Sequence, residues 1–131
     1  MLESFLFVAF FLFLFQALSF WIRTSGEGVV CNSGGSFGIP VNSVFLSSVL
    51  VVVLGFFFFV WWKKREESTC FWWLLIFTAG ASNMGERLFF GCVFDYIHLP
   101  LGLVGNAADI ALAASVVFLL WREIQGEKMT S

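Results

Sequence analysis

An all-α membrane protein with four transmembrane helices is the fold class that the sequence predicts, and its composition and four long apolar segments are the observations that predict it. The chain has 131 residues, of which 60% are hydrophobic and 12% are charged. A soluble domain is only about half apolar. With 19 Phe and 6 Trp, the chain lacks the charged surface that a soluble fold of this size needs. We therefore expect a single integral membrane domain over residues 1–131.

The apolar segments are each long enough to cross the hydrocarbon core, which needs about 20 residues of helix. Helices are the expected structure because unsatisfied backbone groups are not tolerated in lipid. We expect them at about residues 4–22, 43–62, 69–90 and 101–121, joined by short outer loops. The first segment could instead be a cleaved signal peptide, but Glu3 stands where a basic region belongs and the apolar run is long.

Basic residues indicate the orientation of the helices. Lys63, Lys64 and Arg65 lie between the second and third segments, and Arg122 and Lys128 follow the fourth. By the positive-inside rule, that link and both termini are expected in the cytoplasm, so the first and third loops face outward. The formal net charge is −2 and no basic patch is present, so nothing indicates nucleic acid as a partner.

Two aspartates lie in otherwise apolar surroundings. Asp109 precedes Trp121 by 12 residues, which at 1.5 Å per residue places it about 18 Å from the cytoplasmic boundary, in the outer half of the membrane. Asp95 follows the outer end of the third segment. The two acids can therefore meet near the outer surface. An acid within a membrane helix is a functional-site hypothesis by default.

A pair of carboxylates permits a specific chemistry. Two such groups close together in a low-dielectric site cannot both ionise cheaply, so they share a proton and their apparent pKa values separate. One can then take a proton from water while the other gives a proton to a scissile carbonyl or a leaving amine. This is aspartic protease chemistry, and it needs no metal. The alternative is that Asp95 is a solvated loop acid and Asp109 a hydrogen-bonding residue of the bundle.

Three sequence blocks surround these acids: NSGGSFG, NMGERLFFGCVFDY and NAAD. In this order they resemble the N-x-G-x-x-F-G, N-x-x-D-R-x-x-x-G-x-V-x-D-F and N-x-A-D blocks of the lipoprotein signal peptidases, the signal peptidase II family. The matching residues are Asn32, Gly34, Phe37 and Gly38 in the first block, Asn83, Arg87, Gly91, Val93 and Asp95 in the second, and Asn106, Ala108 and Asp109 in the third. The four-segment layout extends the similarity over nearly the whole chain.

The resemblance implies an intramembrane aspartic endopeptidase at the outer face of the bacterial plasma membrane. Its substrate would be a prolipoprotein whose cysteine already carries a diacylglyceryl group, cut on the N-terminal side of that cysteine. Asp95 and Asp109 would be the catalytic acids, and no cofactor is expected. The residues expected to bind substrate or support the site are Asn32, Gly34, Phe37, Asn83, Glu86, Arg87 and Asn106. The implied partners are the lipid-modified precursor and membrane lipids, with the chain acting as a multi-pass monomer.

Spacing within the blocks suggests roles for the supporting residues. Asn83 and Arg87 are four residues apart and share a helix face, as do Asn106 and Asp109, three apart. We expect both asparagines to hold substrate amides and Arg87 to anchor the outer loop or an acidic partner. An interhelical polar clasp is the alternative for Asn83 and Arg87. Glu86 is expected to be structural, with its partner in the surroundings of Arg87.

The sequence also departs from the family pattern. The family's first helix usually carries D-Q-x-x-K, whereas Phe15 and Ser19 stand here at the Asp and Lys positions. Glu86 replaces an Asp, and Tyr96 replaces a Phe. Two other functions therefore stay open. One is a non-catalytic paralogue that binds signal helices or lipids, and the other is a small transporter subunit that uses Asp109 as a proton or ion site.

The remaining candidates carry weaker signals. Cys31, Cys70 and Cys92 form no zinc pattern. Cys31 and Cys92 could both face outward and pair, but we expect free thiols. Phe37 and the glycines around it suggest a loop that dips toward the membrane, with an ordinary connector as the alternative. His98 has no ligand-spaced partner, so we expect it at the membrane interface.

Overall fold

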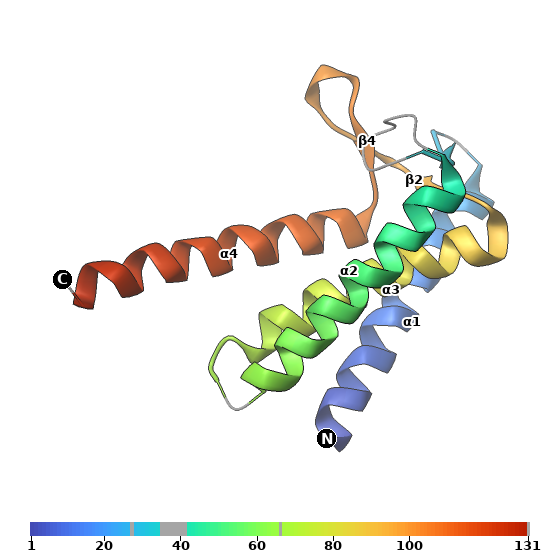
Figure 1. The fold of residues 1–131 in the computed structure, drawn as a ribbon. Helices are drawn as coiled ribbons and strands as arrows, with labels where there is room; N and C mark the ends of the chain where they lie inside the picture. The colour runs from blue at the N-terminus through green and yellow to red at the C-terminus, as the bar shows by residue number, and fades with distance from the viewer. Residues whose placement is uncertain (27, 35–41, 66, 131) are drawn as a thin grey trace.

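The computed structural model describes residues 1–26, 28–34, 42–65 and 67–130. The chain is mostly helical, as expected (Figure 1). Its helices are α1 (Leu2–Ser25), α2 (Ser43–Lys64), α3 (Cys70–Phe90) and α4 (Ala107–Thr130). The sequence analysis did not predict the short strands, which are β1 (Val30–Asn32), β2 (Val93–Asp95), β3 (Ile97–His98) and β4 (Val104–Gly105). The strands form two antiparallel pairs, β1 with β2 and β3 with β4.

Helix α3 is the centre of the helical part. The most extensive contacts between helices are those of α3 with α1, α2 and α4. One apolar cluster joins three of these helices, since Phe15 of α1 and Ala108 of α4 both pack with Leu75 and Ala79 of α3. The small side chains of Ala79 and Ala108 let the backbones approach closely, which is common where membrane helices pack. The cluster holds α4 against α3 at the third sequence block, to which Ala108 belongs.

The outer surfaces of α1 and α2 are apolar. Phe13 is 74% exposed and Val52 is 71% exposed, which suits a surface covered by lipid rather than water. By length and composition, two segments of the described chain could cross a membrane: Leu2–Ser25 and Phe45–Lys64. Helix α3 carries several polar residues, among them Asn83, and α4 begins near Asp109. Membrane crossing by these two helices and the cytoplasmic location of both ends stay predictions.

The fourth helix starts later than predicted, at Ala107 instead of about residue 101. A hairpin of β3 and β4 occupies the preceding residues and projects away from the helices (Figure 1). Its base is closed by a hydrogen bond from the Tyr96 N–H to the Gly105 carbonyl, 2.9 Å. Leu101 and Gly102 at its tip both have positive φ, 67° and 75°. The sequence analysis missed this turn because the run is as apolar as a membrane helix. The chain reverses here because Pro100 and Gly102 favour a turn over a helix start.

Candidate functional site

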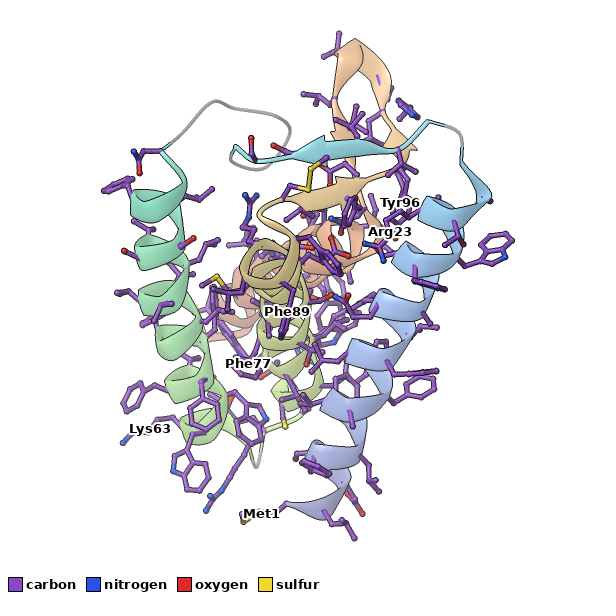
Figure 2. All side chains as sticks on the ribbon, turned by 90° about the vertical axis from the view of Figure 1, so that its right-hand side faces the viewer. Met1, Arg23, Lys63, Phe77, Phe89 and Tyr96 are labelled. Atoms are coloured by element: carbon purple, nitrogen blue, oxygen red, sulfur yellow. A yellow bond between two sulfur atoms is a disulfide. The ribbon has the colours of Figure 1, made fainter. Side chains whose placement is uncertain are left out.

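The strands β1 and β2 bring two distant parts of the chain together beyond the end of α3. They pair antiparallel, with Val30 opposite Asp95. A disulfide joins Cys31 to Cys92, with 5.5 Å between the Cα atoms, and it is the yellow bond between the two strands in Figure 2. The expectation of free thiols was therefore wrong. The two sulfurs meet because the strands pair, and that pairing is not readable from the spacing of the cysteines.

This disulfide should matter for both stability and activity. We expect the double variant Cys31→Ser, Cys92→Ser to melt at a lower temperature and to lose activity, because the bond closes a separation of 61 residues and holds β1 on β2 beside Asp95. The measurement is intrinsic fluorescence during heating in detergent, with and without reductant. Cys70→Ser is the matched control, since Cys70 is a free cysteine. Identical melting of the double variant and the control would contradict this prediction.

Asp95 is held by two asparagines. It is 3% exposed. Its Oδ2 accepts a hydrogen bond from Nδ2 of Asn32, 3.0 Å, and its Oδ1 accepts one from Nδ2 of Asn106, 3.1 Å. Burial raises the pKa of the Asp95 carboxyl, although the two amide donors and the Arg87 guanidinium act in the opposite direction. Asp95 thus retains a proton closer to neutral pH than an ordinary aspartate does.

Asn32 is oriented by its own turn. The Gly34 N–H donates to Oδ1 of Asn32, 3.0 Å, which is the local pattern of an Asx turn. The other end of the amide, Nδ2, is then free to face Asp95. Asn32 and Gly34 of the first block therefore act together to present one hydrogen-bond donor to the carboxylate. Phe37, the remaining candidate of this block, lies outside the described residues.

Asp109 is placed by the way in which α4 begins. The Asp109 N–H donates to Oδ1 of Asn106, 3.0 Å, and the Asn106 N–H donates to Oδ2 of Asp109, 3.1 Å. This reciprocal pair is a capping box, with Asn106 at the N-cap and Asp109 three residues later. Asn83 of α3 donates to the second oxygen, Oδ1, over 2.8 Å. The sequence N-A-A-D thus starts the helix and orients the acid at the same time.

Asn106 connects the two aspartates. It is 4% exposed, and its Nδ2 donates both to Asp95 and to Oδ1 of Asn83, 3.1 Å in each case. Its backbone N–H donates to Asp109. Both carboxylates are therefore hydrogen-bonded to one residue. The sequence analysis expected Asn83 and Asn106 to hold substrate amides, whereas in this structure both side chains are bonded to the acids and to each other.

Other candidates lie around this network. Arg87 extends from α3 to the loop after β1, where its Nη1 donates to the Ser33 carbonyl, 3.4 Å. Glu86 is buried, and its partners are Ser19 and the backbone of Phe94. The structural role expected for Glu86 stays a prediction, and its bonded partners lie in α1 and β2. The acid reaches the neighbouring helix α1 and the strand β2 because its longer side chain extends across both.

Tyr96 is a site residue that the sequence reasoning counted only as an interfacial aromatic and a departure from the family pattern. Its hydroxyl accepts a hydrogen bond from the Ala107 N–H, 3.1 Å, at the first turn of α4. Burial raises the pKa of the Tyr96 phenol. His98 lies further along the hairpin, and its Nε2 is 2.9 Å from the Gly28 carbonyl. In the described part of the chain, no group of three or more His, Cys, Asp or Glu side chains could hold a metal ion.

The fold and the site define a class: a helical membrane protein with two carboxylates bridged by asparagine amides at the end of its central helix. A sequence model of the family described as signal peptidase (SPase) II matches residues 26–125, which contain all three blocks. The chain therefore belongs to the signal peptidase II family. Members of this family are membrane proteases of lipoprotein processing.

Solved structures show the same fold. Three chains match, and one of them is described as a bacterial membrane enzyme whose structure was obtained by the in meso method. That structure is 16% identical to this chain, with a TM-score of 0.79, and the match covers 98% of this chain and 92% of the other. Comparison with curated protein sequences finds no match.

Proposed function

We propose that the chain is an aspartic endopeptidase that removes signal peptides from diacylglyceryl-modified prolipoproteins at the outer face of the bacterial plasma membrane. The observation that carries this proposal is the bridge through Asn106, which bonds to Asp95 by its side chain and to Asp109 by its backbone. Two buried acids attached to one residue can hold a single proton between them. In a member of the signal peptidase II family, such a pair is suited to peptide hydrolysis.

In the proposed mechanism, a water molecule between Asp95 and Asp109 attacks the scissile carbonyl. The ionised carboxylate takes a proton from the water while the protonated carboxyl gives its proton to the carbonyl oxygen. As the carbon–nitrogen bond breaks, the protonated acid gives its proton to the leaving amine and the ionised acid takes a proton from a hydroxyl of the tetrahedral intermediate, so the pair again holds one proton. Asn32, Asn83 and Asn106 keep the carboxylates oriented in every step.

A cleavage assay tests this function. The purified chain in lipid bilayers is given a diacylglyceryl-modified precursor and, separately, the same precursor without the lipid, and the products are identified by mass spectrometry. We expect cut product only from the modified precursor, ending immediately before the lipidated cysteine. Binding of the precursor without any cleavage would instead support the non-catalytic paralogue. Proton flux into liposomes that Asp109→Asn abolishes would support the transporter.

The pH dependence of cleavage should respond to Asn32. Its amide donates to Asp95 and lowers the pKa of that carboxyl against the effect of burial. Asn32→Ala removes a hydrogen bond to the ionised form, so the pKa of Asp95 should rise further. The pair then keeps its proton to higher pH, and the alkaline limb of the pH profile of kcat/KM should move upward. A downward shift of that limb would contradict the prediction, and Asn42→Ala, outside the site, should leave the profile unmoved.

A further inference from the structure

Glu86 is a buried acid that the proposed mechanism does not use. It is 5% exposed, and its two oxygens bind two different parts of the fold. Oε1 accepts a hydrogen bond from the Ser19 hydroxyl of α1, 2.5 Å, and Oε2 accepts one from the Phe94 N–H of β2, 2.8 Å. Burying a carboxylate is costly unless its oxygens are bonded to donors. Here each oxygen has one donor, so a single side chain of α3 connects α1 to β2.

The bond to Phe94 fixes the strand next to Asp95. Strand β2 pairs with β1 on one edge, where Cys31 lies opposite Phe94. The Phe94 N–H donates to Glu86, so Glu86 holds the strand from α3 at the residue before Asp95. Helix α1 adds a second contact, because the Arg23 guanidinium lies 4.5 Å from the centre of the Phe94 ring.

We infer that Glu86 is a positioning residue for Asp95, which it places through the backbone of Phe94, and that Ser19 is its matched partner. This inference rests on the proposed function, because it assigns Glu86 to the placement of a catalytic acid. Phe94 and Asp95 are adjacent residues, so a contact that holds the Phe94 N–H acts close to the Asp95 side chain. A shift of β2 therefore moves the carboxylate relative to Asn106 and Asp109 directly, and misplacing a catalytic group by about 1 Å is enough to slow a reaction strongly.

The side chains of Ser19 and Glu86 have complementary lengths. Ser19 and Glu86 each depart from the family pattern, and the structure shows that they contact each other. A short hydroxyl on α1 faces an acid that is one methylene longer than aspartate, so the contact between the helices is kept. A third departure, Phe15, packs in the apolar cluster with Ala108. The departures thus form a consistent set around the site, which argues for a working enzyme and against loss of function.

The test compares kcat and KM of variants on the diacylglyceryl-modified precursor. Glu86→Met keeps much of the length of the side chain, but it has no oxygen to accept the bonds from Ser19 and Phe94. We expect kcat to fall on the order of 10- to 100-fold with KM changed less than about twofold, the pattern of a misplaced catalytic group. Glu86→Asp should lose similar activity because it is too short, and Ser19→Lys added to it should recover part of the loss. If Ser19→Lys does not restore activity to the Glu86→Asp variant, the proposal that the lengths of these two side chains are matched is wrong.

Ser82→Ala is the matched control. Gln16 donates to the Ser82 hydroxyl, 2.9 Å, which is another hydrogen bond between α1 and α3, one helical turn from Glu86. A loss of packing between the two helices would affect both sites, whereas a positioning effect would spare Ser82→Ala. Wild-type kcat in Glu86→Met, or an equal loss in Ser82→Ala, overturns the inference.

Hydrogen exchange gives a readout that does not depend on cleavage. In Glu86→Met, the amide of Phe94 should exchange faster than in the wild type, while Ser82→Ala leaves it unchanged, because only the first variant removes the acceptor of that amide. If the wild-type chain cuts no precursor, the proposed function fails, but the exchange result still decides whether Glu86 holds β2. Unchanged exchange at Phe94 in Glu86→Met overturns the inference even if the enzyme is active.

Discussion

Asp95→Asn and Asp109→Asn should each lower the rate of precursor cleavage by about 10²- to 10⁴-fold, the range that positioned acids and bases contribute. Asparagine has nearly the same volume as aspartate, but it can neither take up nor release a proton in the reaction. Each variant therefore removes one half of the proposed acid–base pair. The measurement is kcat with the lipid-modified precursor at saturating concentration, together with the melting temperature to confirm that the variant is folded.

An exposed acid of α4 provides the control for this pair. Glu123 lies on the surface of the same helix as Asp109, and Glu123→Gln removes one negative charge without touching the site. This variant should cleave at the wild-type rate. Wild-type cleavage by either aspartate variant would show that the two acids are not the catalytic pair, and the alternative functions would then have to be considered again.

Asn106→Ala should have the second largest effect, a loss of kcat on the order of 100-fold. The substitution removes the side-chain bonds from Asn106 to Asp95 and Asn83 and the cap on Asp109. Asp95 then keeps a single amide donor, from Asn32, and loses its connection to Asp109. Since the geometry of the acids governs proton transfer, a displaced pair should react slowly even though both carboxylates are present.

Asn42→Ala separates this effect from the loss of a helix cap. Asn42 Oδ1 accepts a hydrogen bond from the Phe45 N–H at the start of α2, 3.1 Å, so both asparagines cap a helix. Removing such a cap costs about 1 kcal/mol, so Asn42→Ala measures the effect of a lost cap alone, to which Asn106→Ala adds the loss of the bonds to Asp95 and Asn83. Only Asn106→Ala should lose activity. Equal kcat values for the two variants would contradict the bridging role of Asn106.

Local sequence was a good guide where a short segment makes its own contacts. The sequence analysis placed Asn106 and Asp109 on one helix face, whereas in the structure Asn106 precedes α4 and the two residues are bonded to each other as a capping box. Neighbouring residues encode such a motif because its bonds close within one helical turn. The hairpin before it was missed, since its residues are as apolar as those of a membrane helix. Only the turn residues around Leu101 distinguish this hairpin from the start of a membrane helix.

Contacts between distant segments were less predictable. The sequence analysis considered the pairing of Cys31 with Cys92 and rejected it, and for Glu86 it named no partner more definite than the surroundings of Arg87. Both results have one cause. The disulfide and the Glu86 bonds depend on how β1, β2 and α1 lie around α3, and no periodicity along the chain records that arrangement.

The amino-acid sequence by itself determined that this chain is a helical membrane protein of the signal peptidase II family with two acids in an apolar region. Composition decides the class because so many apolar side chains need lipid around them. Tertiary structure alone decided that Asn106 bonds to both acids, that a disulfide joins β1 to the segment before Asp95, and that Glu86 of α3 bonds to Ser19 of α1 and to the strand of Asp95. The reason is physical: hydrogen bonds and disulfides need a few ångströms of separation, and only the packed helices and paired strands bring these residues that close.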